Sequence, residues 1–289
     1  MEIRTAKRNK AKIRIGLQGP SGCGKTYSSL LMAYGITGDW TKIVVIDTEN
    51  HSADLYADLG NYRVLNLSKP FSPEAYIKAI ETCEKHQDIQ VIIIDSISQE
   101  WEGAGGILET HGNMVGNSFT NWNKVTPRHN AFVQKMLQSR CHIIATIRSK
   151  QDYVLSEKNG KMVPEKVGLK GVTREGMDYE FTIVLDLDIK HNASASKDRS
   201  GLFMDKPSFV IKPSTGKRIL EWCNIGINDK SISIATIEAE IKAAKDIQGL
   251  RDIYNKYPEY QDKIKPLLVA AKQALELPEV IHQDNSPVQ

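Results

Sequence analysis

The chain has 289 residues, of which 40% are hydrophobic and 25% are charged, and its net charge is +3. These proportions are ordinary for a globular protein, and the length allows one large domain with or without a small one. No apolar run approaches the ~20 residues of a membrane-spanning helix, and the basic N-terminus lacks the apolar stretch of a secretory signal. We therefore expect a cytoplasmic protein without a membrane partner, whose four cysteines are reduced thiols.

Residues 1–11 form a basic arm ahead of the first predicted strand. A solvated arm is one interpretation, and an arm that contacts phosphates is the other. The positive charge of the first fourteen residues comes from Arg4, Lys7, Arg8, Lys10, Lys12 and Arg14.

Residues 12–227 alternate short β-rich runs with helical patterns, which predicts an α/β core with a mostly parallel sheet flanked by helices. The run KIVVID (42–47) and the run VIIID (91–95) are almost wholly apolar, as expected for strands buried on both faces. Further strands are predicted at 12–18, 62–67, 142–147 and 181–187, helices at 24–34 and 73–86, and a hairpin around 201–211.

Two polar stretches, 103–123 and 151–176, are rich in glycine, asparagine or lysine and predict long irregular loops. After Trp222 the pattern changes. Helical periodicity over residues 228–277 predicts a small helical C-terminal appendage, and residues 278–289 predict a disordered tail.

The segment between the first strand and the first helix has the pattern of a phosphate-binding loop, G-x-x-x-x-G-K-[ST]. Glycine allows backbone N–H groups to turn toward phosphates, and the helix that follows adds its positive N-terminal end. The lysine would reach the β- and γ-phosphates, and the threonine hydroxyl would bind Mg²⁺. The loop therefore predicts an ATP and Mg²⁺ site made by Gly19, Pro20, Ser21, Gly22, Cys23, Gly24, Lys25 and Thr26.

Two carboxylates follow neighbouring predicted strands. Asp95 ends VIIID and would hold the metal together with Thr26. Glu49 comes two residues after KIVVID, at the same edge of the sheet, where it would orient or deprotonate the attacking water. Cys23 lies in the loop at a helix N-terminus, and if that position lowers its pKa, nucleotide binding would be sensitive to oxidation.

The segment IDTENHSAD (46–54) resembles the RecA-like ATPases, in which the catalytic glutamate follows a strand-ending aspartate by two residues. VIIIDS (91–96) is similar to the metal-binding strand of that family. HIIATIRSK (142–150) resembles its strand ahead of a mobile DNA-binding loop. The resemblance covers about residues 11–222 and is closest to phage and prophage RecA-like ATPases of the recombination and single-strand annealing type.

The resemblance implies two further roles at the nucleotide. Thr146 would be the phosphate sensor by position, although the family more typically has glutamine there. Related replicative helicases supply a Lys-x-Arg pair to the nucleotide of a neighbouring subunit, and Lys197 and Arg199 match that pair in spacing and place. An arginine delivered in this way stabilises charge on the γ-phosphate and requires a homo-oligomer, either a ring or a filament. A solvated Lys-Asp-Arg turn is the alternative.

The same resemblance implies that the two polar stretches contact single-stranded DNA. Lysines along 151–176 would meet phosphates and a tyrosine would stack on a base, whereas a merely solvated loop is the alternative. The candidate contacts are Lys150, Tyr153, Lys161, Lys166, Lys170 and Arg174.

Together these features predict a DNA-stimulated, Mg²⁺-dependent ATPase that acts on single-stranded DNA in phage-type recombination or replication. A helicase-like motor and an annealing assembly that ATP locks without turnover are alternatives. A small-molecule kinase fits poorly, because it would need an acceptor pocket and a lid and would leave Glu49 and Lys197/Arg199 unexplained.

Overall fold

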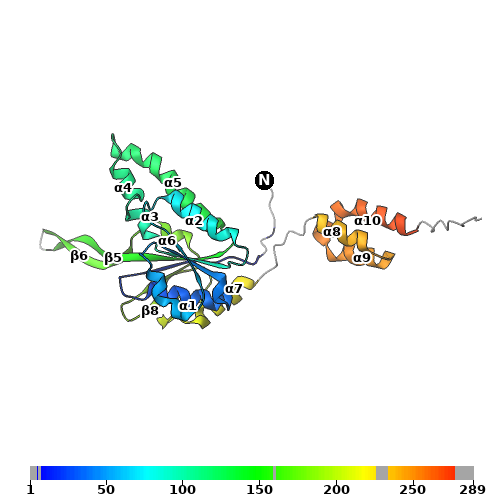
Figure 1. Ribbon diagram of the computed structural model, residues 1–289, viewed down its shortest axis with the longest axis horizontal. Coiled ribbons are helices and arrows are strands. Elements are labelled where there is room, and N and C mark those ends of the chain that lie inside the picture. Colours follow the sequence, from blue (N-terminus) through cyan, green and yellow to red (C-terminus); the bar gives the residue numbers. More distant parts are fainter. Residues whose placement is uncertain (1–4, 6–7, 159–160, 226–233, 277–289) are drawn as a thin grey trace, which may run out of the picture. The chain divides into compact units, whose positions relative to one another are not determined.

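The computed structural model describes residues 5, 8–158, 161–225 and 234–276, and it describes side chains in these ranges except at 151–158, 161–169, 234–236 and 259. The chain divides into two compact units, Met1–Ile227 and Asn228–Gln289, which we describe separately (Figure 1). Within the described part, no helix has both the length and the apolar character needed to cross a membrane.

A nine-stranded sheet forms the centre of the first unit, in the order β3-β2-β4-β5-β1-β7-β8-β9, with β6 paired to β5. The strands from β3 to β7 in this order are parallel, and β8, β9 and β6 pair antiparallel. The predicted fold class is confirmed. The strands are β1 (Arg14–Gly19), β2 (Ile43–Asp47), β3 (Arg63–Asn66), β4 (Val91–Asp95), β5 (His142–Lys158), β6 (Lys161–Gly171), β7 (Ile183–Leu187), β8 (Asn192–Asp198) and β9 (Phe209–Val210).

Helices cover both faces of this sheet, α1 and α7 on one and α2 and α5 on the other (Figure 1). The continuous apolar strands require this arrangement, because alternate residues point to opposite faces. Val45 and Ile93 pack in the core with α1, whereas Ile46 and Ile94 pack in the core with α2. Each such burial stabilises the fold by about 1.5–3 kcal/mol. The helices are α1 (Lys25–Thr37), α2 (Pro73–Lys85), α3 (Ser98–Glu102), α4 (Ile107–Gly112), α5 (Ser118–Gln138), α6 (Met177–Glu180) and α7 (Pro213–Asn224).

The predicted loop at 103–123 is wrong, because most of it is helical. It contains α4 and the first turns of α5, and the side chain of Asn117 caps α5 by accepting from the backbone N–H of Phe119 and Thr120. Of the asparagines that suggested irregular backbone, Asn117 caps α5, Asn121 and Asn123 lie along it, and Asn113 follows α4. The α4–α5 pair extends away from the sheet (Figure 1).

The predicted loop at 151–176 is also wrong, since β5 continues far beyond the sheet and β6 returns beside it. The register runs from Ser149 opposite Gly171 to Lys158 opposite Lys161. Backbone pairing can form a ribbon without an apolar face, so the lysine-rich composition concealed it. The side chains of Tyr153, Lys161 and Lys166 lie outside the described residues.

The hairpin predicted around 201–211 is displaced. The hairpin that forms joins β7 to β8, and only two residues of the predicted segment, β9, pair with β8. Asp198 ends β8 and its carboxylate accepts from the backbone N–H of Ser200, Phe203 and Met204. These contacts turn the chain immediately after β8, which ends the pairing there.

Part of the predicted basic arm is attached to the core. The Arg8 guanidinium donates to the carbonyl of Trp222 at 2.8 Å and lies 4.6 Å from the centre of its indole ring. Arg14 is 5% exposed and donates to the carbonyls of Cys141 and Ser139, and burial lowers its pKa to about 10. Arg14 is therefore a structural residue of β1 and no part of a solvated arm.

The second unit consists of α8 (Ile234–Ala243), α9 (Ile247–Lys256), the short 3₁₀ helix η3 (Pro258–Tyr260) and α10 (Gln261–Glu276). Its core contains Ile237, Ile241, Leu250, Tyr257 and Ile264. Glu240 on α8 accepts from both Lys256 and the hydroxyl of Tyr257, which ties α8 to the end of α9.

Candidate nucleotide-binding site

The phosphate loop lies where the sequence predicted it, between β1 and α1. Gly22 and Gly24 have φ values of 80° and 85°, a backbone conformation that residues other than glycine rarely adopt. The Lys25 ammonium donates to the carbonyls of Gly19 at 2.9 Å and Pro20 at 2.8 Å, so it lies across the loop. Residues of the loop and of the first turn of α1, including Gly22, Gly24 and Lys25, line one cavity.

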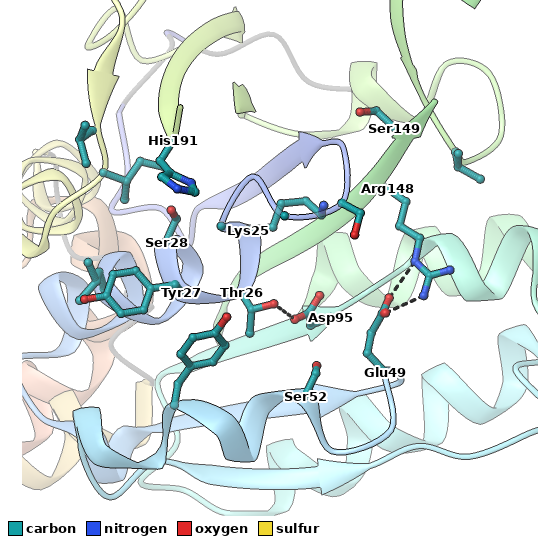
Figure 2. A pocket seen from close by; sticks show the side chains of 18 of the residues that line it. Lys25, Thr26, Tyr27, Ser28, Glu49, Ser52, Asp95, Arg148, Ser149 and His191 are labelled. Carbon is teal, nitrogen blue, oxygen red and sulfur yellow. Dashed lines mark hydrogen bonds and ion pairs between the residues drawn. The ribbon is translucent and has the colours of Figure 1, made fainter. Parts of the chain in front are cut away.

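Asp95 contacts Thr26 of the phosphate loop. The Thr26 hydroxyl donates to Asp95 Oδ2 at 2.5 Å (Figure 2), and the Thr146 hydroxyl donates to Oδ1 at 2.5 Å. Asp95 is 3% exposed. Burial raises its pKa, and the two hydroxyl hydrogen bonds partly offset that rise. The carboxylate is therefore held in a single orientation next to the threonine of the loop.

This pair of oxygens fits a magnesium ion. Mg²⁺ is usually held by one or two protein oxygens, with phosphate oxygens and waters completing the shell. Among the described residues, no group of three or more His, Cys, Asp or Glu side chains could hold a metal by itself.

Thr146 is fully buried below Asp95 and contributes no surface to the cavity described below. Its hydroxyl positions the carboxylate that would bind the metal. Direct sensing of the γ-phosphate by Thr146 stays a prediction.

Glu49 lies on the turn after β2, and Asp47 fixes that turn. The Asp47 carboxylate accepts from the backbone N–H of Glu49 at 2.6 Å and of Ala53 at 2.8 Å. The Glu49 side chain then points toward the end of β4, where Ser96 Oγ donates to it at 3.0 Å.

Arg148 binds the same glutamate. Its Nε and Nη2 donate to Glu49 Oε1 at 2.9 Å and Oε2 at 2.6 Å, which makes a bidentate ion pair (Figure 2). This hydrogen bond raises the pKa of Arg148. The sequence predicts no role at the nucleotide for Arg148. The available signal was its place on β5, just beyond the end of the neighbouring buried strand β4, because polar groups at that edge converge.

A cavity of about 1030 Å³ joins these groups, a volume suited to a nucleoside triphosphate. Tyr27 and Tyr56 line one part of it with their ring centres 5.7 Å apart. His191 lines another part, and its Nδ1 lies 3.1 Å from the carbonyl oxygen of Cys23. A carbonyl only accepts, so Nδ1 carries the proton. The sequence indicated none of these three residues, whereas Lys150, a predicted DNA contact, also lines the cavity.

Lys197 and Arg199 lie away from this cavity. The Lys197 ammonium donates to the carbonyls of Asp178, at 2.8 Å, and Tyr179, and Arg199 Nη2 donates to the same Tyr179 carbonyl at 3.1 Å. Lys197 lines a separate hollow of about 410 Å³ together with Lys170 and Arg174. Their action on a neighbouring subunit's nucleotide stays a prediction.

The prediction for Cys23 is wrong. Its thiol is fully buried, and this burial raises its pKa, which the nearby Lys25 only partly offsets. The proximity of the helix N-terminus is therefore outweighed by the loss of solvent.

A family model described as an AAA domain matches residues 11–221, well over half of the chain. The chain belongs to the AAA domain family. The matched AAA domain contains the phosphate loop, Asp95, Glu49 and Arg148, and it ends within α7. Its family supports nucleotide binding by a P-loop ATPase. The chain matches no curated protein.

Proposed function

We propose that this AAA domain hydrolyses ATP with Mg²⁺ and couples the reaction to single-stranded DNA in phage-type recombination or replication. One observation carries the proposal. The phosphate loop, Asp95 and Glu49 open on a single cavity, and Arg148, at the base of the β5–β6 hairpin, is bound to Glu49. An ATP site is thus joined directly to a projecting element that can contact a polymer.

Each residue has a defined task in this proposal. Lys25 binds the β- and γ-phosphates, and the loop N–H groups hold the phosphate oxygens. Thr26 and Asp95 hold Mg²⁺, which when bound would neutralise charge on the phosphates. Glu49 orients the attacking water and accepts its proton at a carboxylate oxygen once Arg148 no longer occupies both oxygens.

The DNA would run along the hairpin and the α4–α5 pair, both of which extend from the sheet (Figure 1). Lys150 and Lys170 are exposed and directly opposite each other at the hairpin base. Arg174 follows β6, although its Nη1 is buried. Positive charge at the hairpin base suits a phosphate backbone. The hairpin also carries the remaining predicted contacts, Tyr153, Lys161 and Lys166.

A second candidate is an assembly that ATP locks onto single strands with negligible turnover. The Glu49–Arg148 pair favours it, since a glutamate bound through both oxygens is a poor base. A helicase-like motor would need the same cavity with rapid turnover. The proposed homo-oligomer, with Lys197 and Arg199 acting on a neighbour, is common to these candidates.

The test is ATP hydrolysis with and without a single-stranded oligonucleotide, with the oligomeric state measured alongside. We expect stimulation by DNA, and loss of about 2–4 kcal/mol of transition-state stabilisation in Lys25→Ala, by analogy with other preorganised charge donors. Lys85→Ala, on the far end of α2, serves as the matched control. DNA-dependent binding of ATP without turnover would favour the locked assembly. Absence of any DNA effect at low salt would contradict both.

Action in trans is tested by mixing inactive subunits. Arg199→Ala and Glu49→Gln subunits should restore part of the activity at hybrid interfaces, because one interface then combines an intact glutamate with an intact arginine. If no mixing ratio restores activity, the pair does not act on a neighbour.

A further inference from the structure

The C-terminal unit carries a groove that the proposed ATPase does not use. It lies between α9 and α10 and has a volume of about 410 Å³. Its lining residues follow helical spacing on both helices. They are Ile247, Leu250, Arg251, Tyr254 and Asn255 on α9, and Lys265, Leu268, Val269 and Lys272 on α10.

The floor of this groove is apolar and continuous with the core of the unit. Leu250 is 5% exposed and belongs to that core, whereas Val269 on the opposite helix is 51% exposed. Leu268, next to Val269 on α10, is half-buried and packs against the core of the unit. An aliphatic side chain as open as Val269, next to a hollow, gains from being covered by another apolar surface.

The charged residues around the groove all have one sign. Arg251, Lys265 and Lys272 line it, and no carboxylate does so among the described residues. This is not a consequence of overall charge, because acidic residues outnumber basic ones in residues 228–289. The carboxylate of Glu240 is bound to Lys256 on α9, and Asp252 accepts from Gln248. Only Lys272 of the three cations has a described carboxylate partner, Glu276 at 3.6 Å.

We propose that this groove binds an acidic amphipathic helix of a partner protein. A helix laid between α9 and α10 would cover Val269 and Leu268 with its apolar face, making a four-helix packing. Acidic residues on its flanks would then meet Arg251, Lys265 and Lys272. An apolar floor with a cationic rim selects against a purely apolar helix and also against a basic one. The proposal is independent of the ATPase chemistry, because it uses no residue of the nucleotide site.

The experiment uses the full chain and a fluorescein-labelled peptide of about four helical turns, with leucines on one face and glutamates on the flanks. Fluorescence anisotropy gives the affinity. Lys265→Glu should weaken binding by about 10-fold, and Lys265→Glu with Val269→Asp should abolish it. The matched control is Lys263→Glu, a neighbouring exposed lysine on α10 outside the groove, which should change binding less than about 2-fold.

Two further peptides test whether binding requires both the apolar face and the acidic flanks of the helix. A peptide with serines in place of the leucines, and one with lysines in place of the glutamates, should each bind at least about 10-fold more weakly. The proposal would be overturned if Lys263→Glu and Lys265→Glu weakened peptide binding equally. It would also be overturned if both altered peptides bound with the same affinity as the original peptide. Displacement of the peptide by a single-stranded oligonucleotide in both wild type and Lys263→Glu, but not in Lys265→Glu, would instead assign the groove to nucleic acid. Lys265→Glu is at an exposed position, so its circular dichroism should match that of the wild type.

Discussion

Asp95 is the last residue of one parallel strand and Glu49 follows the end of its neighbour, yet their surroundings differ. Asp95 is 3% exposed and its carboxylate accepts from two threonine hydroxyls. The Glu49 side chain is 26% exposed and is bound through both oxygens by an arginine whose own side chain is 40% exposed. The buried carboxylate has neutral partners that hold it in place, whereas the more open one has a charged partner that can leave.

This contrast separates the two halves of the proposed reaction. The two residues proposed to hold the metal, Thr26 and Asp95, are already in contact in the fold. The water side depends on the Glu49–Arg148 pair, and Arg148 belongs to the strand that continues into the β5–β6 hairpin. Both side chains of this ion pair are partly exposed, so solvent screens it, and we propose that a ligand on the hairpin or a phosphate in the cavity exchanges it.

The largest effect is expected on the metal side. Asp95→Asn keeps the shape but removes the charge, and ATP hydrolysis should fall about 10²–10³-fold. Steady-state rates over a range of Mg²⁺ concentrations measure this. Asp54→Asn, an exposed carboxylate outside the cavity, is the control and should keep its activity. An unchanged Mg²⁺ dependence in Asp95→Asn would remove Asp95 from the metal site.

A smaller effect is expected when only the orientation of Asp95 is disturbed. Thr146→Val has the same shape but no hydroxyl, so Asp95 loses one of its two hydrogen-bond donors. The Mg²⁺ concentration for half-maximal activity should rise by about 10-fold. Thr82→Val on α2 makes the same chemical change far from the cavity. A change in the KM for ATP with unaltered Mg²⁺ dependence would point to phosphate sensing instead.

The smallest effect, an increase in the rate of ATP hydrolysis, is expected when the Glu49–Arg148 pair is broken. Arg148→Ala frees Glu49, so hydrolysis without DNA should rise by about 2- to 5-fold, and stimulation by DNA should shrink. Arg128→Ala removes a similar bidentate pair, with Glu74, outside the cavity, and should leave the rate unchanged. Loss of hydrolysis in Arg148→Ala would mean that the arginine contacts the phosphates, and the contrast between the two carboxylates would fail.

The sequence was sufficient for the buried strands and for the loop between β1 and α1. Continuous apolar runs are stable as strands buried between two layers of helices. Because parallel strands end at the same edge of the sheet, Asp95 at the end of β4 then lies near Thr26 after β1. The glycine and lysine positions of the loop are fixed by phosphate geometry. The strands and the loop follow from local pattern, and the shared edge at which parallel strands end places Asp95 beside the loop, which is why these features could be predicted.

Contacts between distant segments could not be predicted in the same way. The Glu49–Arg148 pair joins residues 99 positions apart. It forms because the segment after β2 and the middle of β5 reach the same level at the edge of the sheet. The hairpin beyond Ser149 is held by backbone pairing, which leaves no apolar period in the sequence. The later part of α5, around 131–137, was predicted as a helix, but its early turns were missed because they are polar, and the asparagine cap marks where the helix begins.

The most direct test of the proposed function is single-turnover hydrolysis of Mg²⁺-ATP by Glu49→Gln, with ATP binding measured on the same sample. The amide cannot accept the proton of water, so we predict hydrolysis reduced by about 10²–10⁴-fold while the affinity for ATP changes little. Glu74→Gln, a glutamate that an arginine also holds outside the cavity, should hydrolyse ATP at the normal rate. Hydrolysis by Glu49→Gln at the wild-type rate would contradict the assignment of Glu49 as the residue that activates water.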